Sequence, residues 1–150
     1  MKVEYNKHQI MLDYVSEKLA ELVGTYPAFN FLDSLDGSIS MQTTTSIVPV
    51  KRYMRGTTQK NRYDFTLVFA MAYSRYTDEV NMQAITLCQE FIDWFNLQGR
   101  RRNYPDFGPA CRILQMECAD SSEIAQIDIE NSLALYRIPC QVTYMEQYEV

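Results

Sequence analysis

The stretch "YDFTLVFAMAYS", residues 63–74, alternates large and small side chains from one end to the other. Every second position is large: Tyr63, Phe65, Leu67, Phe69, Met71 and Tyr73. Because successive side chains of a strand point to opposite faces of the sheet, this alternation predicts a central antiparallel strand with one heavily packed face. At about 3.3 Å per residue the strand reaches roughly 40 Å, longer than a typical strand, so part of its hairpin is expected to project.

Positive charge gathers just before this strand. A short strand is expected at residues 50–54, and "RGTTQKN", which contains Gly56, predicts the turn that joins it to residues 63–74 in a hairpin. Five basic residues surround the tip of this hairpin: Lys51, Arg52, Arg55, Lys60 and Arg62. Two interpretations stay open. The cations either discourage unwanted pairing at a sheet edge, or they form a contact tip for an acidic neighbour or for nucleic acid.

Two further charged clusters follow along the chain. Arg100, Arg101 and Arg102 come after a predicted helix, where cations also interact favourably with the helix dipole. Acidic residues dominate a later segment that contains no Lys or Arg: Glu117, Asp120, Glu123, Asp128 and Glu130. Patches of opposite charge on one chain can complement each other between copies, so all three clusters are candidate assembly contacts. The net charge of −5 argues against a general nucleic-acid binder.

The N-terminal third contains a helix and a first strand. Residues 6–23 place apolar side chains at three- and four-residue spacings, which predicts an amphipathic helix with Asn6 as its N-cap and Gly24 as its C-terminal stop. From residue 39 to residue 47 the period changes to two, which predicts a strand. Pro49 then interrupts the pattern, so the chain bends there or lies at a sheet edge.

The C-terminal half predicts one helix and two strands. The helix begins with a cap at Thr77 or Asp78 and runs to Gln98, with Gly99 as its stop. A strand near residues 111–119 leads into an acidic, polar connection, and residues 136–144 form the last strand. Because proline cannot donate to a ladder, Pro139 predicts that this last strand lies at an edge or carries a bulge.

The expected element order is therefore α-β-β-β-α-β-β. Each helix has an apolar stripe that must be buried against a sheet, which predicts a two-layer α+β fold with a mainly antiparallel sheet. A length of 150 residues suits one domain, residues 1–150, with a single core.

The sequence supplies few residues for catalysis. His8 is the only histidine, and the five glycines form no nucleotide-binding motif. Cys111 and Cys118 are too far apart in sequence for a zinc knuckle, so core filling by reduced thiols is the expected role of the cysteines. We therefore expect no catalytic, cofactor-binding or metal-binding residues. Eleven tyrosines favour assembly over an active site, because Tyr and Arg are enriched at protein interfaces.

Neither a membrane span nor a signal peptide is expected. No apolar run approaches the roughly 20 residues that cross a bilayer. The N-terminal "MKVEYNKHQIM" lacks the apolar centre of a signal peptide, which favours a protein that is made and used in a cytoplasm.

Three stretches carry a resemblance to a known family. They are "VPVKRYMRGTTQKNRYDFTLVFAMAYS", "EFIDWFNLQGRRRNYPDFG" and "YRIPCQVTYME". With the helix that precedes them, they resemble the small phage proteins labelled minor capsid proteins and grouped with tail terminators. The likeness covers residues 48–145 and is one of texture and element order rather than of a catalytic signature.

The resemblance implies a structural function. Tail terminators are α+β subunits that form a ring, commonly a hexamer, on the last ring of a tail tube. They stop tube growth and present the surface that a head connector joins, and they are not enzymes. The implied partners are further copies of the chain, the tail tube protein, and the sheath or the head–tail connector. The implied location is a virion or a phage-tail-like particle assembled in the bacterial cytoplasm.

Two alternatives from other classes stay open. One is an enzyme of unrecognised class that acts through Cys or Tyr, which a single hyperreactive cysteine would favour. The other is a nucleic-acid-binding accessory protein that uses the two basic clusters, which steeply salt-dependent binding would favour.

Overall fold

The computed structural model describes residues 6–32, 36–43, 47–52, 58–73, 78–118, 123–128 and 132–147. Within these residues, two helices and seven strands follow one another in the order α-β-β-β-β-α-β-β-β. The predicted α+β class is confirmed, but the predicted order lacked a short strand after the first helix and the strand before the last one. The elements are α1 (Lys7–Val23), β1 (Ala28–Phe29), β2 (Ser38–Gln42), β3 (Val48–Arg52), β4 (Thr58–Ala72), α2 (Asp78–Arg100), β5 (Cys111–Cys118), β6 (Glu123–Asp128) and β7 (Leu133–Gln147).

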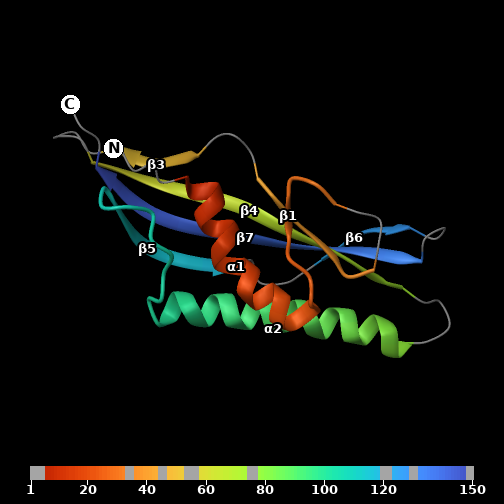
Figure 1. Ribbon diagram of the computed structural model, residues 1–150. Helices are drawn as coiled ribbons and strands as arrows, with labels where there is room; N and C mark the ends of the chain where they lie inside the picture. Colours follow the sequence, from red (N-terminus) through yellow and green to blue (C-terminus); the bar gives the residue numbers. More distant parts are fainter. Residues whose placement is uncertain are drawn as a thin grey trace.

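Two long strands form the centre of the sheet (Figure 1). β4 and β7, each 15 residues long, pair antiparallel over their full lengths, from Thr58 opposite Gln147 to Ala72 opposite Leu133. The other side of β4 pairs with β2 and β3, and the other side of β7 pairs with β5 and β6. The short β1 adds to β2 in parallel. Each flank of the sheet is thus built from two short strands laid end to end.

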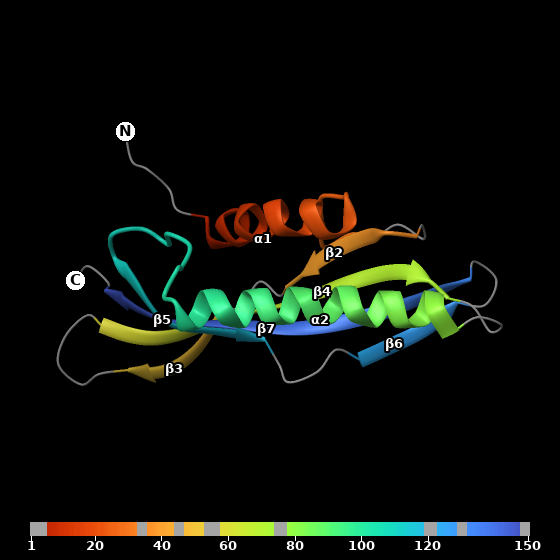
Figure 2. The ribbon, with the colours of Figure 1, turned by 90° about the horizontal axis from the view of Figure 1, so that it is seen from below.

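Both helices pack against the same face of the sheet. On β4, Phe65 contacts Phe95 of α2 with ring centroids 5.9 Å apart, and Tyr63 contacts His8 of α1 at 5.3 Å. Tyr63 and Phe65 are two residues apart and therefore point to the same side. Figures 1 and 2 show α2 running alongside β4 and β7. The helices form one layer and the sheet forms the second.

The predicted packed face of the central strand is confirmed. The large side chains of β4 that precede Tyr73 are all buried, and alternate residues of β7 complete the same face. These core residues are Tyr63, Phe65, Leu67, Phe69, Met71, Tyr136, Ile138, Cys140, Val142 and Tyr144. The strand itself begins at Thr58, five residues earlier than its apolar alternation, because the pairing with β7 continues through the polar segment before Tyr63.

The ends of α1 are as predicted. The Asn6 side chain accepts hydrogen bonds from the backbone N–H groups of His8 and Gln9, at 3.0 and 3.3 Å. Gly24 ends the helix in the left-handed conformation, with φ of 80°. Both residues satisfy backbone groups that the helix itself leaves unpaired.

The predicted end of α2 is wrong. The helix does not stop before Gly99 but continues to Arg100, and the residue in the left-handed conformation is Arg102, with φ of 56°. Gly99 lies inside the helix, against the backbone of Met116 on β5. The glycine is therefore placed by close packing rather than by helix termination. The predicted cap at Thr77 lies outside the described residues.

The polar connection predicted before the last strand is also wrong in part. Residues 123–128 form β6, which pairs antiparallel with β7. The register shifts between Ile124 and Gln126, so this strand contains a bulge. A bulge breaks the alternation of side chains, which explains why the acidic segment shows no period of two.

The last strand is not at an edge. β7 pairs with β4 on one side and with β5 and β6 on the other, so Pro139 lies in a central strand. Its partner on β4 is Thr66, whereas β5 pairing stops at Cys140 and β6 pairing stops at Arg137. The proline occupies the gap between the two flanking strands, where a missing N–H group breaks no ladder.

Two other strand bounds differ from expectation. β2 ends at Gln42 rather than near residue 47, and β3 spans Val48–Arg52 rather than residues 50–54. Pro49 lies in β3, which has a bulge between Pro49 and Lys51 and, among the described strands, pairs with β4 alone. The edge position predicted from this proline is confirmed.

Candidate assembly surface

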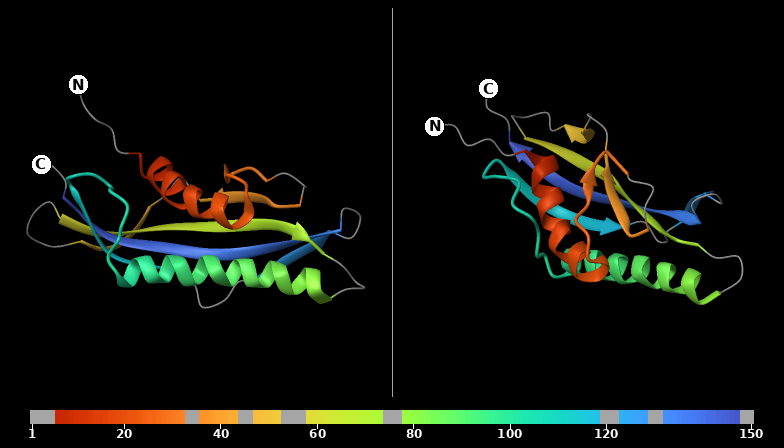
Figure 3. Two further views of the ribbon diagram at one scale, coloured as in Figure 1. Left: turned by 60° about the horizontal axis from the view of Figure 1, so that its bottom comes forward. Right: turned by 45° about the vertical axis from the view of Figure 1, so that its right-hand side comes forward.

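One face of the sheet carries no helix. Odd-numbered residues of β4 point into the core, so even-numbered ones point to the opposite side, together with the odd-numbered residues of β7. We call this side the helix-free face. Figures 2 and 3 show that the beginning of β4 and the end of β7 extend past the C-terminal end of α2. Residues 53–57 of the predicted tip, with Arg55, lie outside the described residues.

Strand register collects three cations in one line across the helix-free face. Lys51 of β3 lies opposite Lys60 of β4, Lys60 lies opposite Met145 of β7, and Met145 lies opposite Arg112 of β5. We call Lys51, Lys60 and Arg112 the basic row. Like charges directly opposite each other destabilise a sheet, so the fold tolerates this row rather than needing it.

Arg112 was not among the predicted contact residues. It is the only cation in "CRILQMEC" and lies about fifty residues after Lys60 in the chain. Only the pairing of β5 with β7 places it beside the hairpin cations. Of the predicted cluster, Lys51 and Lys60 belong to the row, and Arg52 lies in β3 with its backbone opposite Gln59.

The next residues along the strands neutralise each other. Arg62 Nε donates to Asp64 Oδ1 at 2.8 Å, and this carboxylate raises the pKa of Arg62 above its ordinary value. In the same region Gln141 Nε2 donates to Glu117 Oε1 at 2.6 Å. Arg62 and Glu117, both predicted contact residues, are therefore already paired within the chain. The basic area is confined to the end of the sheet.

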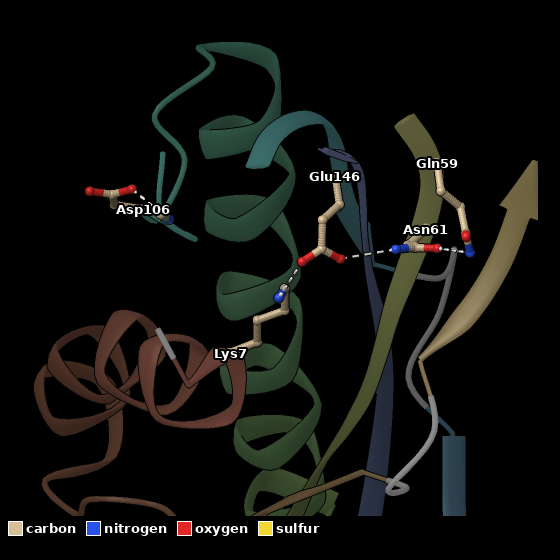
Figure 4. Close-up of polar contacts among 6 residues, drawn as sticks. Lys7, Gln59, Asn61, Asp106 and Glu146 are labelled. Carbon is tan, nitrogen blue, oxygen red and sulfur yellow. Dashed lines mark hydrogen bonds and ion pairs between the residues drawn. The ribbon is translucent and has the colours of Figure 1, made fainter. Parts of the chain in front are cut away.

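At the same end of the sheet, a chain of polar contacts lies on the face that packs against the helices (Figure 4). Gln59 Nε2 donates to Asn61 Oδ1 at 2.7 Å, and Asn61 Nδ2 donates to Glu146 Oε2 at 3.2 Å. Lys7 Nζ of α1 pairs with the other oxygen of Glu146 at 3.4 Å. The chain joins α1, β4 and β7, so the strand ends that carry the basic row are fixed to the first helix.

The second basic cluster lies apart from the basic row. Arg100 ends α2, Arg101 and Arg102 follow it, and all three side chains are exposed. Arg100 and Arg102 border a depression of about 410 Å³ between the end of α2 and β5, which Tyr104 and Glu117 also line. The structure therefore offers two separate basic surfaces.

The predicted acidic cluster is divided by the fold. Glu117 lies in β5, whereas Glu123 and Asp128 are the first and last residues of β6, beside the other half of β7. Asp120 and Glu130 lie outside the described residues, and only the backbone of Glu123 and Asp128 is described. Nothing in the described residues joins these five acids into one surface.

A different acidic surface lies on α1. Asp13, Glu17 and Glu21 are four residues apart and exposed, whereas Met11, Val15 and Leu19 of the same helix are buried. Side chains at this spacing line one side of a helix. We call these three residues the acidic stripe. Their spacing was visible in the sequence, but no prediction used it.

Four groups that could serve a covalent mechanism have raised pKa values. Burial raises the pKa of the Cys111 thiol to about 11 and the pKa values of the Tyr14 and Tyr63 hydroxyls to about 12. Burial also raises the pKa of Cys140 well above its ordinary value. These groups stay protonated at neutral pH, which does not favour a nucleophilic role.

His8 has a structural environment. Its Nδ1 lies 2.7 Å from the Tyr63 hydroxyl, and its ring packs against Phe29 with centroids 5.4 Å apart. Within the ranges that the structure describes, no three His, Cys, Asp or Glu side chains form a group that could hold a metal ion. Among the described helices, none is long and apolar enough to cross a membrane.

Neither a scan of protein-family models nor a search of curated proteins finds a match to this chain.

Proposed function

We propose that the protein is a structural subunit that forms a ring at the end of a phage tail tube, or of a tail-like particle, where it stops tube growth and provides a joining surface. The observation that carries this proposal is the pair of oppositely charged surfaces on one small α+β subunit. The basic row lies on the helix-free face, and the acidic stripe lies on α1. A ring subunit needs such complementary surfaces, because every copy presents one to each neighbour.

The sequence resemblance to tail terminators supplies the partner. It implies that the ring sits on tail tube protein, with the sheath or a head–tail connector as further neighbours. The raised pKa values of Cys111, Tyr14 and Tyr63 weigh against the enzyme alternative. The confinement of the basic row by Asp64 and Glu117 weighs against the nucleic-acid alternative, since phosphate binding gains from a long basic track.

Electron microscopy of the protein mixed with purified tail tubes tests the proposal. We expect a ring of added density at one tube end, and tubes so capped should not lengthen when tube protein is added. A protein that leaves tube ends bare and tube growth unchanged would contradict the proposal. Salt-sensitive binding to DNA in place of tube binding would support the nucleic-acid alternative.

A further inference from the structure

The acidic stripe and the basic row face opposite sides of the molecule. Met11, Val15 and Leu19 point from α1 toward the sheet, so the stripe points away from it. Lys60 and Arg112 point from the other face of the same sheet. A surface and its complement on opposite sides cannot meet within one chain. They can meet between two chains.

We infer that the acidic stripe of one copy binds the basic row of the next copy, in a head-to-tail contact. The partner is thus a second copy of this chain, bound by charge pairing of Asp13, Glu17 and Glu21 with Lys51, Lys60 and Arg112. The inference deepens the proposed function and rests on it, because it names the contact through which the ring would form.

The two surfaces have similar lengths. Asp13 and Glu21 are eight residues apart, which is about 12 Å along a helix. The basic row crosses from β3 to β5 over three spacings between strands, about 14 Å in all. The row runs across the strands, and Figure 1 shows that α1 also crosses them obliquely. Three acids can therefore lie along three cations.

Both surfaces have described charges that form no ion pair within the chain. Within the described part of the chain, no ion pair uses Lys60, Arg112 or Glu17. Glu21 contacts Lys18 at 3.4 Å, but its side chain is 71% exposed. By contrast, the Arg62–Asp64 pair beside the row is complete in itself. On this face the proposed contact is therefore limited to the basic row. This limit fixes where the acidic stripe of the partner copy would bind.

Head-to-tail contacts of this kind repeat from copy to copy. Each copy uses its stripe for one neighbour and its row for the other, so the contact is heterologous. Such contacts close into a ring when the rotation between copies divides a full turn, and form a filament otherwise. The inference therefore accounts for assembly from a single type of contact.

A charge-swap experiment tests this contact without a tail tube. Lys60→Glu with Arg112→Glu reverses the row, and Asp13→Lys with Glu17→Lys reverses the stripe. We expect the wild-type chain to self-associate at high concentration and low salt, and each double variant alone to remain monomeric in sedimentation velocity. An equimolar mixture of the two variants should associate again, because each then offers the charge that the other lacks.

The mixture also separates lost contact from lost folding, since misfolded variants would not restore association. Arg100→Glu with Arg101→Glu is the matched control, because it changes the net charge equally at the other basic surface and should leave association unchanged. A control that disrupts assembly as strongly, a mixture that stays monomeric, or a wild-type chain that never associates would overturn the inference. If the protein still caps tail tubes in any of these cases, the proposed function stands and only the contact is wrong.

Discussion

Gly99 of α2 lies so close to Met116 of β5 that a β-carbon at Gly99 would come within 2.1 Å of the Met116 carbonyl oxygen. Two neighbouring contacts tie the helix to the same strand. Asn96 Oδ1 accepts from the Cys118 backbone N–H at 2.8 Å, and the Tyr104 hydroxyl donates to the Leu114 carbonyl at 3.2 Å. The end of α2 and the following loop thus cover the outer edge of β5, which limits unwanted pairing there.

Gly99→Ala is expected to destabilise the protein by about 1–3 kcal/mol, because the methyl group forces helix and strand apart. The sign of the change in unfolding free energy distinguishes a tightly packed position from an open one. In an open helix position the same change would stabilise by about 1 kcal/mol. Urea unfolding followed by Trp94 fluorescence measures the effect, and Gln83→Ala, at an exposed position of α2, is the control expected to be near neutral. A stabilised Gly99→Ala protein would show that the close contact is absent.

The Lys7–Glu146 ion pair is expected to contribute about 1 kcal/mol in a double-mutant cycle with Lys7→Met and Glu146→Gln. The chain offers a matched control in Lys18 and Glu21, which have the same residue types and the same 3.4 Å separation. The side chains of the first pair are only 15% and 19% exposed, whereas Glu21 is 71% exposed. Water screens the control pair, so its coupling should be smaller. Equal couplings would contradict this account of burial.

Cys118 and Cys140 are expected to form a disulfide under oxidation. Their sulfur atoms lie 3.2 Å apart, and the residues are direct partners on β5 and β7. Directly opposite residues of an antiparallel pair have α-carbons about 4.5–5.5 Å apart, within the range that a disulfide spans. Oxidised glutathione would accept the two electrons while both thiols release their protons. Mass spectrometry should find the mass of two hydrogens lost and the two cysteines linked.

The resulting cross-link should raise the urea midpoint, because it restricts the unfolded chain. Cys118→Ser is the control that should abolish both the mass change and the shift. A link that instead uses Cys111, or none at all after prolonged oxidation, would refute the prediction.

Stability is expected to fall in alkali. Burial raises the pKa values of Tyr14 and Tyr63 from 10.0 to about 12, so the folded protein holds protons that the unfolded chain releases. The contribution of the two protonated hydroxyls to the free energy of unfolding is therefore complete below pH 10 and is lost as the pH rises toward 12. Urea midpoints measured across this range should decline, and Tyr14→Phe should make the decline shallower. Tyr26→Phe, at a hydroxyl that is largely exposed, is the control that should leave the slope unchanged.

Local features of the sequence were sufficient for much of the fold. The packed face of β4 follows from an alternation of side chains, and the caps of α1 follow from Asn6 and Gly24, because each depends on residues within a few positions. The α+β class follows from the succession of such elements. Predictions from local sequence were wrong where pairing with a neighbouring strand determines the structure. The bulge conceals β6, and the gap between β5 and β6 admits Pro139 into a central strand.

Some features of the candidate surface likewise follow from the sequence, whereas others depend on the tertiary structure. The sequence by itself determined that Lys51 and Lys60 lie near one hairpin, and that Asp13, Glu17 and Glu21 repeat every four residues, because both relationships depend on short separations along the chain. Only the tertiary structure decided that Arg112 joins the row, that Arg62 is already paired with Asp64, and that row and stripe lie on opposite sides. The physical reason is register, since hydrogen bonding between β4, β7 and β5 aligns residues that are distant in sequence.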